Sequence, residues 1–98
     1  MKKVDFTHRA NTDLREIWQF TARRWNIDQA DSYIGQILET CNSLAMGQLD
    51  GRDARNVQSG LRKQATGSHV VYFQESPDYI LVIRILHKRM EAASHFED

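Results

Sequence analysis

The sequence predicts an α+β fold, and three observations support this prediction. Two amphipathic helical patterns lie next to each other, separated by two residues. Three runs with strand character follow them, and a short alternating stretch precedes them. The predicted order is therefore β-α-α-β-β-β, with a helical hairpin packed on one face of a small, mainly antiparallel, curved sheet. We expect all 98 residues, 1–98, to form one domain.

The first strand and the first helix are predicted from the change in apolar spacing near residue 7. Val4 and Phe6 alternate with polar residues, which indicates a strand over residues 2–7. Thr7 is a suitable N-cap for the helix that follows. The apolar face of that helix recurs at spacings of three and four and consists of Ala10, Leu14, Ile17, Trp18, Thr21 and Trp25. We expect the helix to end at Asn26.

A second helix is expected directly after the first. Asp28 is the predicted N-cap, and Gly47 is the predicted stop. The apolar stripe between them consists of Ala30, Tyr33, Ile34, Ile37, Leu38, Cys41, Leu44 and Ala45. Because only residues 26–27 separate the two patterns, the helices should form an antiparallel hairpin.

The rest of the chain reads as a loop and three strands. Residues 47–59 are mainly polar and are predicted to be a loop, whereas residues 60–66, 69–75 and 79–87 are predicted strands. The last strand begins with apolar residues on both faces, so we expect it to be central in the sheet. Residues 89–96 are expected to add a short helix or an extended tail.

We expect the core to form between the hairpin and the sheet. Its predicted members are Leu14, Trp18, Trp25, Tyr33, Ile37, Val71, Phe73, Ile83 and Ile85. Trp18 and Trp25 are the expected large anchors of this contact. Truncating either one to alanine would cost about 3–5 kcal/mol if the side chain is buried.

Composition narrows the function classes. The formal net charge is zero, so the whole chain is not a general polyanion binder, but residues 52–90 carry seven Lys and Arg against three Asp and Glu. Cys41 is the only cysteine, which favours a reducing compartment. The sequence shows neither a leader pattern nor an apolar run long enough for a membrane, so we expect a cytoplasmic protein. The four histidines lack short metal-ligand spacing, and we predict no metal and no cofactor.

The candidate binding residues are cations near the end of the last strand. Arg84 interrupts an apolar run, so it must be paired or reach the surface. One alternative is a structural ion pair with Asp13 or Glu16, and the other is a concave site where Arg62, Arg84 and His87 converge. The strand exits through three further candidates, Lys88, Arg89 and Met90, which form either a solvated edge or a docking strip.

Several strings resemble the ParE toxin family of the RelE/ParE superfamily. The first is the segment 10–18, which ends in Ile17-Trp18, and Trp25 with Tyr33 looks like the following turn and second helix. The more specific strings are Gly60-Leu61-Arg62, Gly67-Ser68-His69-Val70-Val71-Tyr72 and Arg84-Ile85-Leu86-His87-Lys88-Arg89-Met90. This resemblance covers nearly the whole chain and implies the RelE/ParE-like arrangement of the fold given above.

The resemblance also implies a function. It predicts the toxin of a type II toxin–antitoxin system, which inhibits DNA gyrase and is neutralised by a cognate antitoxin. The antitoxin would have a disordered acidic C-terminal segment that folds on the toxin. We expect no membrane partner and no sequence-specific DNA binding by the toxin alone.

The alternative within the superfamily is a ribosome-dependent mRNA endoribonuclease of the RelE type. Several such enzymes place a tyrosine near the C-terminus, whereas this chain has His95-Phe96 there. The missing phenol favours a binding inhibitor over an enzyme, and we predict no catalytic residue. We therefore expect His95 and Phe96 to belong to the target- or antitoxin-binding surface, or Phe96 to hold the tail against the core.

Overall fold

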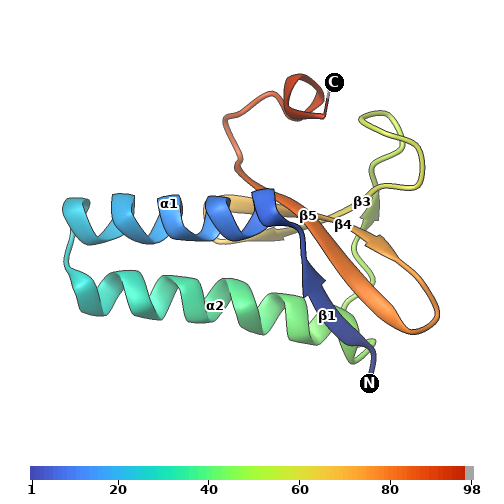
Figure 1. The fold of residues 1–98 in the computed structure, drawn as a ribbon, viewed down its shortest axis with the longest axis horizontal. Helices are drawn as coiled ribbons and strands as arrows, with labels where there is room; N and C mark the ends of the chain where they lie inside the picture. Colours follow the sequence, from blue (N-terminus) through green and yellow to red (C-terminus); the bar gives the residue numbers. More distant parts are fainter. Residues whose placement is uncertain (97–98) are drawn as a thin grey trace.

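The computed structural model describes residues 1–96, and within them the predicted α+β arrangement is confirmed. The elements are β1 (Lys3–Phe6), α1 (His8–Arg24), α2 (Ile27–Ala45), β2 (Arg52–Asp53), β3 (Arg62–Thr66), β4 (His69–Glu75), β5 (Tyr79–His87) and a 3-10 turn, η1 (Ala92–His95). The five strands of the described residues lie in the order β1-β5-β4-β3-β2. β1 is parallel to β5, and the other pairs are antiparallel. Figure 1 shows α1 and α2 side by side as a hairpin, with the chain returning from β5 to a tail above α1.

Two caps set the starts of the helices. The side chain of Thr7 accepts a hydrogen bond from the Ala10 N–H at 3.1 Å, as predicted. The prediction for α2 was wrong, because Asn26 and not Asp28 is the N-cap. Asn26 has extended backbone angles, and its side chain accepts a hydrogen bond from the Gln29 N–H at 2.8 Å. Asp28 already lies in the first turn of α2, where its charge is favourable near the positive end of the helix dipole.

The segment 47–59 is not entirely a loop. It contains β2, a two-residue strand that pairs with β3 through Arg52 opposite Lys63 and Asp53 opposite Arg62. A strand of this length has no alternation of apolar and polar residues, so periodicity does not reveal it. The prediction that the last strand is central is confirmed, because β5 lies between β1 and β4.

The main core lies between the hairpin and the sheet. Of the predicted members, Ile37, Val71, Phe73 and Ile85 are buried in it. Leu14 and Tyr33 are half-buried and pack against it. Ile83 is also half-buried, but it packs on the opposite face of the sheet. Cys41 belongs to the core between the hairpin and the sheet. Burial raises the pKa of its thiol to about 11, so the thiol stays protonated near pH 7.

The two tryptophans do not act as the expected anchors. Trp25 is 65% exposed, so its assignment to the core was wrong. Trp25 follows the last residue of α1, at the hairpin end that projects beyond the strands in Figure 1, and the Arg24 guanidinium lies 4.8 Å from its ring centre. Trp18 is half-buried, and its indole N–H donates to Asp31 of α2 at 2.8 Å. Trp18 therefore joins the two helices to each other.

A smaller core covers the other face of the sheet. Ala54, Leu61, Tyr72 and Leu86 are buried there, under the 54–61 segment and the C-terminal tail. The ring of Phe96 meets the ring of Tyr72 edge-on, with centroids 5.4 Å apart. Among residues 1–96, neither helix has the length and apolar character needed to cross a bilayer.

Candidate functional site

A groove lies between α1 and the end of β5, and we call it the α1–β5 groove. Its volume is about 550 Å³. Its lining comes from α1, one residue of α2, the start of β4 with the residue before it, the end of β5 and the tail. The lining residues are Asp13, Glu16, Ile17, Phe20, Thr21, Trp25, Tyr33, Ser68, His69, Arg84, Ile85, Leu86, His87, Met90 and His95.

The groove exists because β1 is shorter than β5. β1 ends at Phe6, opposite Val82, so the outer edge of β5 beyond that point has no neighbouring strand. The N-terminal part of α1 satisfies this edge instead. The hydroxyl of Thr7 donates to the Ile83 carbonyl at 2.7 Å, and the Asp13 carboxylate accepts from the Ile85 N–H at 2.9 Å. The last residues of β5, Leu86 and His87, are among those that line the groove.

Arg84 forms the structural ion pair that the sequence offered as one alternative. Its Nε and Nη2 atoms donate to the two carboxylate oxygens of Asp13 at 2.9 and 3.0 Å. Both residues are buried, and hydrogen bonding to Asp13 raises the pKa of Arg84 above its ordinary value. The carboxylate thus accepts three hydrogen bonds, counting Ile85, and the charges of this pair compensate each other within the wall of the groove.

An irregularity in the sheet accompanies this ion pair. Tyr72 is opposite Arg84, whereas the next residue, Phe73, is opposite Val82, so Ile83 is an extra residue on β5. Such a bulge bends the strand and changes the direction of the side chains beside it. We infer that this bulge directs the Arg84 side chain from the sheet toward Asp13 on α1.

A cluster of Tyr33, His69 and His87 lines the groove. The Tyr33 hydroxyl is 2.6 Å from Nδ1 of His69 and accepts a hydrogen bond from the Ser68 N–H at 2.9 Å. The imidazole rings of His69 and His87 are 5.2 Å apart and meet edge-on. Burial, followed by the effect of His87, lowers the pKa of His69 to about 4, so this ring is neutral near pH 7.

Gly67 allows Tyr33 to approach this turn. Gly67 has a φ of +57°, and a Cβ atom at this position would lie 2.6 Å from a ring carbon of Tyr33. A glycine is therefore required both by the backbone conformation and by the space that the phenol ring occupies.

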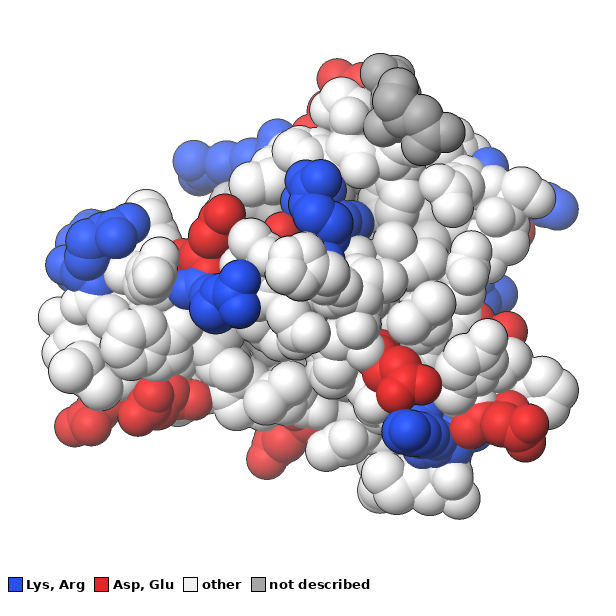
Figure 2. All heavy atoms as spheres, viewed as in Figure 1, with Lys and Arg blue, Asp and Glu red and all other residues white. Residues whose placement is uncertain are grey.

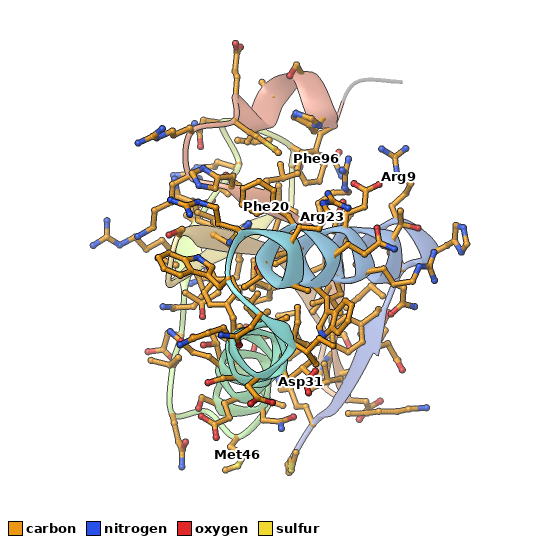
Figure 3. The ribbon with its side chains drawn as sticks, turned by 90° about the vertical axis from the view of Figure 1, so that its left-hand side faces the viewer. Arg9, Phe20, Arg23, Asp31, Met46 and Phe96 are labelled. Atoms are coloured by element: carbon orange, nitrogen blue, oxygen red, sulfur yellow. The ribbon has the colours of Figure 1, made fainter. Side chains whose placement is uncertain are left out.

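Exposed aromatic and basic side chains surround the groove. Phe20 and Met90 are 63% and 48% exposed, and Trp25 lies near the hairpin turn. Figure 3 shows Phe20 and Arg23 on the side of α1 that faces the tail carrying Phe96. In Figure 2, Lys and Arg atoms gather over the hairpin end of α1, whereas Asp and Glu atoms lie below, over the start of α2. An exposed apolar rim with cations beside it is typical of a protein interaction site.

The structure brings together only some of the predicted site residues. Arg84, His87, Met90 and His95 line the groove, and the exposed Lys88 and Arg89 follow directly after β5. Phe96 instead lies on the opposite face of the sheet, against Tyr72.

The other alternative, in which Arg62 converges with Arg84 and His87, is wrong. Arg62 lies on β3, and its guanidinium donates to the backbone carbonyls of Asp50 and Gly51 at 3.1–3.3 Å. β4 separates β3 from β5 in the sheet, and Arg62 is used to hold the segment before β2.

Sequence reasoning missed the aromatic rim and the role of Tyr33. Phe20 lies outside the periodic apolar face of α1, and a large aromatic side chain on the polar side of a helix is a signal that could have revealed it. Tyr33 was expected only as a core residue, because its hydrogen bonds to residues 68 and 69 depend on the tertiary fold.

Comparisons with known proteins agree on one family. The family described as "ParE toxin of type II toxin-antitoxin system, parDE" matches residues 4–92. Toxin ParE1 of Caulobacter vibrioides is 34% identical over 95 residues, which cover 97% of this chain and 98% of that protein. Toxin ParE1 of Mycobacterium tuberculosis is 32% identical over 83 residues, which cover 84% of this chain and 85% of that protein.

Solved structures agree with the fold. A chain from the chromosomal ParDE toxin–antitoxin system of P. aeruginosa superposes with a TM-score of 0.76 at 21% identity, covering 89% of this chain and 96% of that one. A variant of YafQ from E. coli superposes with a TM-score of 0.61 at 9% identity, covering 99% of this chain and all of that one. At these identities the likeness concerns the fold alone.

Proposed function

Because the chain belongs to the ParE toxin family of type II toxin–antitoxin systems, we propose that it inhibits DNA gyrase by binding to it and breaks no bonds itself. The family match over residues 4–92 carries this proposal. The state of Arg84 supports the absence of catalysis, since Asp13 already occupies the guanidinium that an RNA-cleaving site would need to stabilise a phosphorane. The proposed place of action is the cytoplasm, where gyrase acts on DNA.

We propose that the strip after β5 contacts gyrase. Lys88, Arg89 and Met90 are exposed and consecutive, and the Met90 N–H is held by the His87 carbonyl at 2.9 Å. This short turn fixes the two cations next to an apolar side chain at one end of the groove. Such a combination suits a protein surface that offers carboxylates around an apolar contact.

A supercoiling assay with purified toxin, gyrase and relaxed plasmid tests this function. We expect inhibition and accumulation of cleaved plasmid at micromolar toxin. The double variant Lys88→Glu/Arg89→Glu should require at least about tenfold more protein, because charge reversal opposes docking. The matched control Lys3→Glu/Arg15→Glu reverses two exposed cations elsewhere and should inhibit like the native chain. Normal supercoiling at micromolar excess of the native toxin would disprove gyrase as the target.

A type II system supplies a cognate antitoxin, and we propose that its acidic C-terminal segment folds into the α1–β5 groove. The groove offers apolar side chains to such a segment, and Arg24, stacked on Trp25, offers charge at its hairpin end. Folding on the toxin would bury apolar surface that is exposed in both free partners.

Calorimetry at several temperatures, using the antitoxin encoded beside the toxin gene, tests this binding mode. We expect a clear decrease in heat capacity on binding. Trp25→Ala should weaken binding by at least about tenfold, since exposed aromatic residues often dominate interfaces. Binding without a heat-capacity decrease would contradict coupled folding in an apolar groove.

A further inference from the structure

The pairing of His69 with His87 places two imidazoles at one end of the groove. They are directly opposite each other in the β4–β5 register, at the start of β4 and the end of β5. Their rings meet edge-on at a centroid distance of 5.2 Å, and both residues line the groove. The proposed inhibition of gyrase gives this pair no role.

Hydrogen bonds at Nδ1 determine which nitrogen of each ring carries the proton. The Arg89 N–H donates to Nδ1 of His87 at 3.1 Å, so the neutral His87 ring must carry its hydrogen on Nε2. The Tyr33 oxygen already accepts from the Ser68 N–H and lies 2.6 Å from Nδ1 of His69, so we assign the phenol hydrogen to the bond with Nδ1. His69 therefore carries its hydrogen on Nε2 as well.

Both Nε2–H groups are left as donors. Among residues 1–96, the hydrogen bonds of these two rings involve Nδ1 and none involves Nε2. Every fully buried side-chain nitrogen or oxygen in this part of the chain has a partner. It follows that the two Nε2 atoms are not fully buried and that solvent reaches them, and the groove is the open space that both residues line.

The surroundings favour an acceptor that is attached to apolar groups. Ile17 and Ile85 line the same groove as the two imidazoles and supply hydrocarbon to it, and the charges of Asp13 and Arg84 compensate each other. Glu16 is the remaining carboxylate of the lining, and it is exposed, so water screens it. The exposed Lys88 and Arg89 follow His87 directly in the chain.

We propose that His69 and His87 form a carboxylate-binding subsite, in which their two Nε2–H groups hold an Asp or Glu carboxylate of a bound peptide segment. The apolar neighbours of that residue would lie along Ile17 and Met90. The identity of the segment as part of the antitoxin rests on the proposed function, whereas the chemistry of the subsite does not. A phosphate of a nucleic acid is the competing source of an anion, but it would bring no hydrocarbon to the groove.

Small probes test the subsite directly by NMR of the isotope-labelled full chain. The probes are hexanoate, hexylammonium as a chain of matched length with the opposite charge, and inorganic phosphate. We expect hexanoate to shift the imidazole signals of both histidines and to bind at least about tenfold more tightly than the other two, because ionised acceptors form the stronger hydrogen bonds. Equal effects of hexanoate and hexylammonium would overturn the proposal. Preferential binding of phosphate would overturn it in favour of a nucleic acid.

Variants locate the effect on the named groups. His87→Phe keeps an aromatic ring but removes the Nε2–H donor. It should weaken the binding of hexanoate at least about fivefold. His8→Phe changes an exposed histidine outside the groove and should leave hexanoate binding unchanged. If His87→Phe does not fold, long-range ¹H–¹⁵N spectra of the native chain still decide, since an Nδ1–H tautomer at either ring would refute the proposal. A failed gyrase assay would leave these outcomes unaffected.

Discussion

At the scale of single residues, the most consequential group is the Asp13 carboxylate. It accepts hydrogen bonds from two guanidinium nitrogens of Arg84 and from the Ile85 N–H, and it is buried. We expect Asp13→Ala to lower the free energy of unfolding by about 3–5 kcal/mol, because it leaves a buried charge and a strand N–H without a partner. Urea denaturation monitored by circular dichroism measures this loss.

The control for this prediction is a surface pair. Lys3 lies 3.7 Å from Asp5, and both side chains are well exposed. Lys3→Ala should change the free energy of unfolding by less than about 0.5 kcal/mol. A loss of less than about 1 kcal/mol for Asp13→Ala would show that water compensates Arg84, and our account of the buried pair would be wrong.

The neutral state of His69 predicts how stability depends on pH. Its pKa is about 4 in the folded chain, against 6.5 as the ordinary value, so the unfolded chain binds more protons between these two pH values. Stability should therefore rise as pH increases from 4 to 6.5 and should be fully present above that range. Since the groove partly exposes the ring, we expect His69 to contribute about 1–2 kcal/mol.

Comparing urea denaturation across this pH range in two variants isolates the contribution of His69. His69→Gln should flatten the dependence, whereas His8→Gln, which changes an exposed histidine, should keep it. An unchanged pH dependence in His69→Gln would assign the effect to other groups.

At the scale of helices and strands, the caps offer the sharpest test. The Asn26 side chain accepts a hydrogen bond from the Gln29 N–H, whereas Asp28 lies within the first turn of α2. Asn26→Ala should cost about 1 kcal/mol of unfolding free energy, and Asp28→Ala only a few tenths, because the first change loses a cap and the second a helix-dipole interaction. If chemical denaturation showed a larger loss of unfolding free energy for Asp28→Ala than for Asn26→Ala, Asp28 and not Asn26 would be the cap.

The same helices show what periodicity can and cannot predict. A spacing of three and four identified the buried face of α2, including Ile37, and the apolar start of β5 identified the central strand. Periodicity does not say where the sheet under a helix ends, so it extended the face of α1 to the exposed Trp25. Periodicity also failed to predict the two-residue strand β2, because β2 is a strand through its pairing with β3 and not through a pattern in its own sequence.

At the scale of the whole molecule, the groove could not be predicted as a unit. It combines α1, one residue of α2, the turn before β4, the end of β5 and the tail, so its shape depends on contacts between distant parts of the chain. The sequence did indicate that Arg84 needs a partner, because a charge inside an apolar run must be compensated. It did not indicate that Arg62 lies two strands away from Arg84, since cations of similar local context differ only in tertiary position.

The tail links the two faces of the sheet, and this leads to the last prediction. Its beginning lines the groove through Met90, while Phe96 packs against Tyr72 on the other face. Between them, Arg84 donates to the His95 carbonyl at 3.4 Å, a long contact that adds little. We therefore expect Phe96 to provide most of the docking energy of the tail.

Hydrogen exchange measures this docking. Phe96→Ala should speed hydrogen exchange at the amide of residue 96 and at the preceding amides of the tail by at least about tenfold. The reason is that loss of the ring contact lets the tail detach without global unfolding. The buried amides of Val71 and Val82 should exchange as in the native chain. Ser94→Ala, which alters an exposed hydroxyl bonded to the Glu91 carbonyl, should leave the tail docked. Unchanged exchange in Phe96→Ala would show that the turn after β5, and not the aromatic contact, holds the tail in place.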